Sequence, residues 1–268
     1  MVPITIRYLR IYNCCTMRPL LFICFLVLSM LSSVAQDGTS FSDRSNLVKL
    51  NLTSPFLKNY SIQYERIINK RVSVALSGRL MPASTLPFKN AIRKEVIKEE
   101  DALITDAFNQ ARFSNYAITP EVRFYLGKKG YGQGFYIAPY YRFAKYTVEE
   151  LNYTYEDFDQ DISIKLTGNL KSHTGGFLVG AQWMLSNKIG LDWWILGPNF
   201  GGGRGHITGV SNQPIDPDVQ QDIRESLEND LDIPFTKTTV DVNANGANLK
   251  LNGPWAGVRA GLLLTFRF

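Results

Sequence analysis

The last thirteen residues of the chain, 256-AGVRAGLLLTFRF-268, alternate between two kinds of side chain. In an extended strand, side chains at every second position share a face. One face would carry Ala256, Val258, Ala260, Leu262, Leu264, Phe266 and Phe268, and most of the other would be Gly257, Arg259, Gly261, Thr265 and Arg267. A soluble β-domain buries its apolar face against a second layer, whereas a membrane barrel turns that face to lipid and fills its interior with small and charged groups. The arginines on the enclosed face favour a barrel.

Seven other segments have the same period of two, so the sequence predicts eight strands, an even number as in bacterial outer-membrane barrels. The seven span residues 46–53, 59–67, 71–81, 115–126, 135–147, 174–185 and 189–203. Apart from the short first segment, their lengths suit the ~9 to 11 residues of a tilted membrane-crossing strand. Pro120 and Pro139 cannot donate to the ladder and predict a bulge or a widened rung. The predicted fold is all-β, an eight-stranded antiparallel up-and-down transmembrane β-barrel.

The connections between these segments alternate in length. Short turns are expected at 68–70, 127–134 and 186–188, and long extracellular loops at 82–114, 148–173 and 204–254. Helical spacing of apolar residues predicts helices within two long loops, at 89–110 and 217–231, and Asn245-Gly246 predicts a hairpin turn. A secreted soluble barrel of lipocalin type is the rival fold, and it would assign the two faces the opposite way.

The first 35 residues have the pattern of a secretory signal peptide. Three arginines, Arg7, Arg10 and Arg18, come before an apolar stretch at 20–31. Ser33-Val34-Ala35 then supplies small residues for cleavage after Ala35. Cleavage would remove all three cysteines and leave 26 basic against 24 acidic residues, a net charge of +2 instead of +5. Disulfides are then excluded, and nucleic-acid binding loses its support. We expect a periplasmic segment at 36–45 and a barrel at 46–268 in the outer membrane of a bacterium.

Over residues 46–268 the chain resembles small outer-membrane β-barrels of the OmpA/OmpX size class. The terminal Phe268, with Phe266 two residues before it, is similar to the aromatic C-terminal signal that barrel-assembly machinery reads. Two segments, 59-NYSIQYER-66 and 118-ITPEVRFYLG-127, also resemble an uncharacterised outer-membrane barrel family, domain of unknown function 3575. The resemblance implies a location and a fold, and it supplies no catalytic residues.

Charged residues fall on the inward face of the predicted strands. The interior of an eight-stranded barrel is just wide enough for side chains to fill it, and a buried charge needs a partner. We therefore predict an interior ion-pair network of Glu65, Arg79, Glu121, Arg123, Arg142, Asp192 and Arg259. A narrow ion path or gated pore is the functional alternative for the same residues.

The chain has two histidines, His173 and His206, both expected near the outer rim of neighbouring strands. A lipid hydrolase would pair a histidine with a serine and a carboxylate, and Ser172 and Ser211 are nearby, but no nucleophile elbow accompanies them. The glycine run 201–205 lacks the Lys-Ser/Thr ending of a phosphate loop. We predict no metal site and no cofactor.

The function predicted from these patterns is a non-enzymatic structural or surface-interaction role through the extracellular loops. The helices at 89–110 and 217–231 would contact an extracellular ligand, a partner or lipopolysaccharide. The second helix is acidic, which indicates a solvated face or binding of a divalent cation or basic partner. We expect a monomer surrounded by outer-membrane lipid. The alternatives are a lipid-modifying enzyme with an active site at the rim and, more weakly, a narrow pore for small solutes.

Overall fold

The computed structural model describes residues 45–85, 111–156, 161–230 and 235–268. Its described part contains nine strands in one antiparallel sheet, a short 3-10 helix and one α-helix. The strands are β1 (Asn46–Asn51), β2 (Tyr60–Ile67), β3 (Val72–Ser84), β4 (Arg112–Tyr125), β5 (Gly134–Glu156), β6 (Asp161–Met184), β7 (Ile189–Ser211), β8 (Lys237–Asn243) and β9 (Gly246–Arg267). The helices are η1 (Ser54–Leu57) and α4 (Pro217–Asp230).

The sheet closes on itself. Strands β1 to β7 pair in chain order, β7 pairs with β9, and β9 pairs with β1 over Leu47–Asn51. Strand β8 pairs with the first part of β9 and stands outside the ring. The chain is therefore an all-β protein whose antiparallel sheet forms a closed ring of eight strands.

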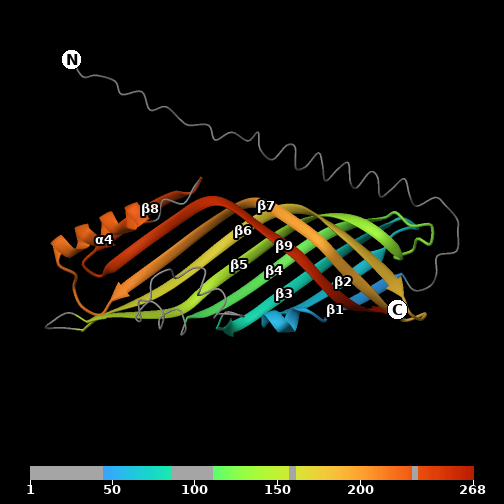
Figure 1. Cartoon of the computed structure of the whole chain (residues 1–268), viewed down its shortest axis with the longest axis horizontal. Coiled ribbons are helices and arrows are strands. Elements are labelled where there is room, and N and C mark those ends of the chain that lie inside the picture. Colours follow the sequence, from blue (N-terminus) through green and yellow to red (C-terminus); the bar gives the residue numbers. More distant parts are fainter. Residues whose placement is uncertain (1–44, 86–110, 157–160, 231–234) are drawn as a thin grey trace, which may run out of the picture. The chain divides into compact units, whose positions relative to one another are not determined.

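The strands of the ring differ greatly in length. β1 and β2 have 6 and 8 residues, whereas β5, β6, β7 and β9 have 22 to 24. Figure 1 shows these four long strands running on past the ends of β1 and β2 toward α4 and β8. At ~3.3 Å per residue, a strand of this length spans roughly 75 Å.

Strand therefore occupies much of what the sequence analysis predicted as loop. Segment 148–173 is not a loop, because β5 continues to Glu156 and β6 begins at Asp161. The tyrosines, threonines and isoleucines of this segment favour strands, but the β5–β6 register shifts between Val148 and Leu151 and breaks the period of two. The predicted loop 204–254 likewise contains the end of β7, α4, β8 and the start of β9.

A helix and a hairpin lie within 204–254 as predicted, but the turn of the hairpin is one residue earlier than Asn245-Gly246. The helix expected at 217–231 is α4, and the expected hairpin joins β8 to β9. Asn243 pairs with Gly246, so the two turn residues are Ala244 and Asn245, and Gly246 follows with φ +139°. The helix expected at 89–110 lies outside the described residues. Within the described parts of the chain, no helix is long and apolar enough to cross a membrane.

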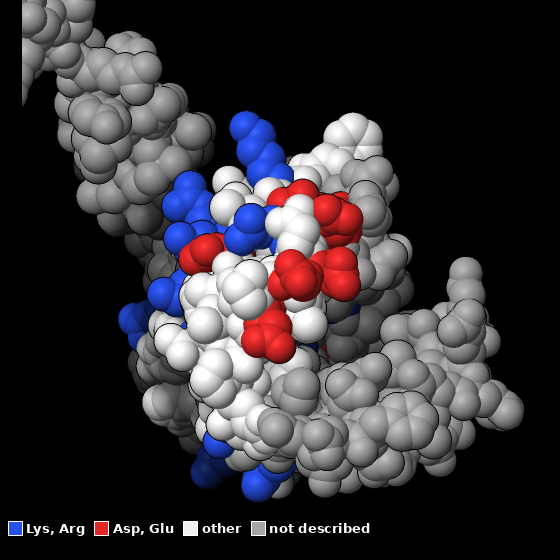
Figure 2. Space-filling view, turned by 90° about the vertical axis from the view of Figure 1, so that its left-hand side faces the viewer, with Lys and Arg blue, Asp and Glu red and all other residues white. Residues whose placement is uncertain are grey.

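Acidic side chains gather on α4. Figure 2 views this end of the protein and shows a group of acidic residues on the surface, with basic residues to one side. The exposed acidic residues here are Asp216, Asp218, Asp222, Glu225 and Glu228. Arg224 of α4 donates a hydrogen bond to the carbonyl oxygen of Val242 at 3.1 Å, which ties the helix to β8.

The ring has an apolar outer face. All eight ring strands expose large apolar side chains, which we call the apolar belt: Leu50, Tyr60, Ile62, Tyr64, Leu76, Leu80, Tyr116, Ile118, Phe124, Phe135, Ile137, Tyr141, Phe177, Val179, Trp183, Ile189, Trp193, Leu196, Phe200, Val258 and Phe266. Polar residues at the intervening positions are buried inside the ring, among them Lys49, Gln63, Glu65, Arg123 and Asp192.

A bulge in β7 changes which of its residues face outward, compared with the strict period of two in the sequence. The register of β7 shifts between Trp194 and Gly197 against β9, and a matching shift occurs against β6. Trp194 is buried inside, and Leu196 is 52% exposed where the strict period had placed Ile195 outward. The extra residue of a bulge moves every later side chain to the other face.

The two prolines do not produce a bulge. The β4–β5 ladder keeps one register through Ile118–Phe143, Glu121–Tyr140 and Phe124–Ile137. The ladder instead skips the rungs between these pairs, where Pro120 and Pro139 lie. Proline thus costs the closed sheet local hydrogen bonds but leaves the alternation of faces intact.

Candidate functional site

A cluster of six charged side chains crosses the inside of the ring. Its members, which we call the interior cluster, come from five strands: Lys49 of β1, Glu65 of β2, Glu121 and Arg123 of β4, Asp192 of β7 and Arg259 of β9. None is more than 6% exposed. Three cations face three anions, so the cluster is neutral as a whole.

Arg123 is the centre of the interior cluster. Its Nε donates to Glu121 Oε1 at 2.7 Å, and its Nη1 lies 2.6 Å from Asp192 Oδ2 and 3.2 Å from Glu65 Oε2. Its Nη2 donates to Gln63 Oε1 at 2.7 Å, and its guanidinium carbon is 4.4 Å from the centre of the Tyr136 ring. Only the planar fork of an arginine can reach this many acceptors in one plane.

Lys49 balances the cluster on its other side. Its ammonium group contacts Glu65, Asp192 Oδ2 at 2.6 Å and the amide oxygen of Gln182. Lys49 is not among the residues that the sequence pattern predicted for the network. The signal was present, because Lys49 shares its face of the first strand with Leu47 and Asn51, opposite Val48 and Leu50.

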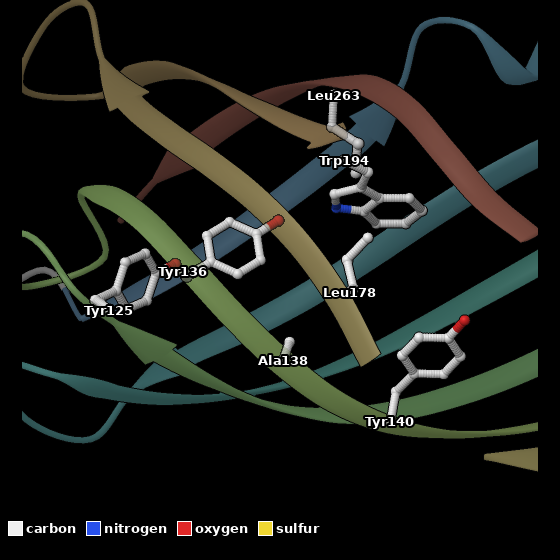
Figure 3. Close-up of a cluster of buried hydrophobic side chains, with 7 residues drawn as sticks. All are labelled: Tyr125, Tyr136, Ala138, Tyr140, Leu178, Trp194 and Leu263. Carbon is white, nitrogen blue, oxygen red and sulfur yellow. The ribbon is translucent and has the colours of Figure 1, made fainter. Parts of the chain in front are cut away.

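Aromatic side chains complete the cluster. The hydroxyl groups of Tyr125 and Tyr136 donate to Glu65 Oε1 and Asp192 Oδ1, both at 2.7 Å. Arg259 donates to Glu121 Oε2 at 2.9 Å, and its guanidinium carbon lies 4.7 Å from the Tyr140 ring and 4.3 Å from the Trp194 ring. Figure 3 shows these aromatic side chains inside the ring with Ala138, Leu178 and Leu263.

Each carboxylate of the interior cluster has at least two donors. Glu121, for example, accepts from Arg123, Arg259 and Gln63. Because burying an unpaired charge costs several kcal/mol, this pairing is what allows the charges to remain inside. The paired side chains fill this part of the ring, whose interior in an eight-stranded barrel is just wide enough for side chains.

Two arginines expected in the network lie apart from it. Arg79 donates to the Asn115 amide oxygen from Nε at 3.1 Å and from Nη2 at 2.6 Å, and Arg142 donates to Thr119 Oγ1 at 3.1 Å. Among the ion pairs within the described residues, neither arginine takes part. Both line a cavity of about 240 Å³ that Arg259 also borders.

The structure does not bring the two histidines together. His173 lies opposite Gly202 in the β6–β7 ladder, and His206 lies opposite Asn169, four residues away along β6. That offset is roughly 13 Å. His173 is exposed beside Tyr141 and Phe143 on the outer face, whereas Ser172 is buried on the inner face.

His206 has a different neighbour, because its Nε2 lies 3.0 Å from Thr208 Oγ1. Across the described parts of the chain, no three His, Cys, Asp or Glu side chains are placed to hold a metal ion. The glycine run at 201–205 is part of β7, where a Cβ on Gly201 would lie 2.1 Å from the His173 carbonyl oxygen. Close backbone contact between strands therefore explains Gly201.

The last residues of the chain lie where the ring closes. Phe266 and Phe268 are 40% and 57% exposed. The backbone N–H of Phe268 donates to the Asn46 carbonyl at 2.9 Å, and the Asn46 N–H donates back at 3.2 Å. Phe268 thus joins β9 to β1. Recognition of this C-terminal signal by barrel-assembly machinery stays a prediction.

Comparison with protein families gives a match over most of the chain. A family profile described as protein of unknown function (DUF3575) matches residues 20–197, roughly two thirds of the chain. No curated protein matches the chain. The matched span contains both sequence segments, 59–66 and 118–127, that resemble this family.

Proposed function

We propose, since the chain belongs to the DUF3575 family of proteins of unknown function, that it is an integral outer-membrane β-barrel of a bacterium. In this proposal the eight-stranded ring crosses the membrane, and the long strands carry a non-enzymatic structural or surface-interaction role outside it.

The observation that carries the proposal is the contrast between the two faces of the ring. All eight ring strands turn large apolar side chains outward, and the charged side chains of five strands pair with one another inside. Contiguous apolar patches on soluble monomers rarely exceed a few hundred Å². A soluble barrel of lipocalin type would bury the apolar face instead.

The outer face of the long strands changes from mostly apolar to cationic side chains at one level, where we place the outer surface of the membrane. One rung across the outer face reads Phe143, His173, Gly202 and Pro254 from β5 to β9. Two residues further along, the rung reads Lys145, Lys171, Arg204 and Asn252. We call Lys145, Lys171 and Arg204 the cationic rung.

The part of β6 between the cationic rung and the end of the strand is long enough to cross a bilayer. On β6, the outward residues from His173 to Trp183 cover 11 residues, close to the ~9 to 11 that a tilted spanning strand needs. The parts of β5, β6, β7 and β9 beyond the rung, together with β8 and α4, would then stand outside the membrane. They present the acidic surface of α4 to a partner (Figure 2).

The geometry favours neither of the alternative functions, a narrow pore or a lipid-modifying enzyme. The interior cluster occupies the inside of the ring with paired charges, which argues against a pore. Within the described residues, the histidines lie on separate sites without a nucleophile and carboxylate beside them. A binding or structural role is the function that remains.

Fractionation of bacterial cells tests the membrane proposal. We expect the protein in the outer-membrane fraction, with migration on a detergent gel that changes on boiling, as for intact barrels. Recovery from the soluble periplasm without detergent would overturn the proposal.

Epitope tags test the orientation in the same cells. A tag between residues 157 and 160 should be accessible to antibody on intact cells, because the β5–β6 end lies outside. The matched tag in the turn at 186–188 should become accessible only after the outer membrane is opened. The reverse result would show that the long strands face the periplasm.

A further inference from the structure

Two cavities lie inside the sheet in succession along the strands, and Arg79 borders both. The first, of about 240 Å³, has a mixed wall that includes Arg79, Arg142 and Arg259 as well as Trp194 and Val258. The second, of about 450 Å³, borders Arg79 and lies further from the interior cluster. Its volume falls within the ~300 to 1,000 Å³ of small-molecule sites.

The second cavity has a largely apolar wall. Phe113, Leu170, Ile207, Leu251 and Trp255 line it, and the rings of Tyr146 and Trp255 lie 5.4 Å apart. The inner face of the sheet thus changes character along the strands, from charged at the interior cluster to apolar beyond Arg79. Water makes few hydrogen bonds to such an apolar wall, whereas a hydrocarbon chain is stabilised there by leaving water.

The arginines between the two regions have donors to spare. A guanidinium carries five N–H donors. Arg142 is 9% exposed and uses one donor on Thr119, whereas Arg79 uses two on Asn115 and also interacts with the Tyr146 side chain. Neither has a carboxylate partner among the described residues, although both border a cavity that a third arginine also lines. An anion in the first cavity would neutralise charges that are otherwise costly to bury.

We propose that this interior site binds an amphiphile with one anionic headgroup. The headgroup, a carboxylate or a phosphate, accepts hydrogen bonds from Arg79 and Arg142, and the hydrocarbon chain lies along Leu170, Ile207, Leu251 and Trp255. The charge and the apolar wall meet at Arg79, which is the arrangement such a molecule requires. The site lies on the inner face of the sheet, so the proposal goes beyond membrane location and does not depend on it.

Quenching of tryptophan fluorescence by a bromine-labelled dodecanoate tests the proposal on the purified full-length protein. Bromine quenches a tryptophan that it contacts, and Trp255 lines the apolar cavity, whereas Trp183 and Trp193 face outward. We expect saturable quenching that the Trp255→Phe variant loses. Trp194 lines the first cavity and is present in both proteins. Quenching that Trp255→Phe retains in full would not come from the apolar cavity and would overturn the proposal.

Competing molecules separate the possible ligands. Unlabelled dodecanoate and dodecyl phosphate should displace the probe, while neutral dodecanol and free inorganic phosphate should displace it at least about tenfold less well. Equal displacement by dodecanol would overturn the role of the arginines. Displacement by inorganic phosphate alone would show a simple anion site and overturn the role of the apolar cavity.

Variants test the headgroup contacts. The Arg79→Gln, Arg142→Gln double variant should weaken dodecanoate binding about tenfold or more, because charge-assisted hydrogen bonds are lost. The matched Lys171→Gln variant removes an outer-face cation and should bind normally. Unchanged binding by the double variant would overturn the proposal, and if that variant fails to fold, the dodecanol comparison on the unaltered protein still decides.

A final variant replaces residues 89–110 with a short Gly-Ser linker. Binding by both this variant and the intact chain supports the proposal. Binding by the variant alone would show that the chain's own segment occupies the cavity, and the proposal would be wrong.

Discussion

Arg123 is the residue on which most of the interior charge depends, because it contacts all three carboxylates of the interior cluster. Replacing it with methionine keeps much of the volume and removes the charge. We expect the Arg123→Met variant to lose about 3 to 5 kcal/mol of unfolding free energy, since buried carboxylates would lose their central partner. Urea unfolding in detergent micelles measures the difference.

The matched control for this prediction is Arg66→Met. Arg66 is exposed and donates to the side chain of Asn46 at 2.7 Å. Its loss should cost less than about 1 kcal/mol. Adding Asp192→Asn to Arg123→Met removes one charge of each sign, so the double variant should lose less than the sum of the single losses. Strict additivity would show that the two residues do not interact.

Leu262 lies on the outward face of β9, in the middle of the apolar stretch from Ala256 to Phe266. If this face meets lipid, the Leu262→Arg variant should lose about 2 to 4 kcal/mol, as expected for a cation near the bilayer midplane. Thr265→Ser, on the inward face, should cost about 1 kcal/mol or less, because it removes one methyl group. Equal losses in unfolding from lipid vesicles would contradict the assignment of faces.

At the scale of elements, the period of two predicted each ring strand but not where the long strands end. Alternation identifies a strand while its faces differ in polarity. Beyond the cationic rung the alternation on β6 is reversed, because polar residues such as Thr167 and Asn169 lie outward while Leu170 and Leu166 lie inward. This part of the strand therefore no longer fits the expected pattern of an apolar outward face. The bulge in β7 could not be predicted for another reason, since its extra residue replaces one apolar outward side chain, Ile195, by the next, Leu196.

The cationic rung makes a prediction about lipid. Like charges directly opposite each other on neighbouring strands destabilise a sheet unless anions balance them. The Lys145→Gln, Lys171→Gln, Arg204→Gln triple variant should therefore unfold at a higher temperature than the unaltered protein in neutral detergent. Added lipopolysaccharide should stabilise the unaltered protein more than the variant, and the same lipopolysaccharide without its phosphates should remove the difference. A similar response of both proteins to intact lipopolysaccharide would contradict lipid contact at this rung.

At the scale of the whole molecule, alternation placed five of the six residues of the interior cluster inside, all except Lys49, but it did not predict which of them meet. Meeting depends on the stagger between strands, which decides that Arg123 lies level with Asp192 and Lys49 while Arg79 and Arg142 lie beyond them. Stagger is a property of the closed sheet and leaves no mark on any one strand. For the same reason the sequence could not show that Arg79 borders both a cavity lined by three arginines and an apolar cavity.

Export of the whole chain predicts a defined mature protein. Cleavage after Ala35 should give an N-terminus at Gln36, which mass spectrometry of the protein from the outer-membrane fraction would detect. Ala35→Glu should block cleavage, because the position needs a small residue. A mature protein that retains residues 1–35 would contradict the signal peptide.

The ring is joined unevenly, and this has a consequence for the order of folding. β7 runs beside β9 from Ile189 to Val210, but the ladder of β1 with β9 covers Leu47–Asn51, with flanking backbone hydrogen bonds at Asn46 and Leu52. Leu47 pairs with a residue 220 positions away. Contacts between residues so far apart in the chain have a high entropic cost and few hydrogen bonds to offset it. The β1–β9 junction would therefore form last, after the hairpins, and the nascent protein would hold two unpaired strand edges until it does. We predict that an assembly factor would hold the unfinished sheet at these two edges.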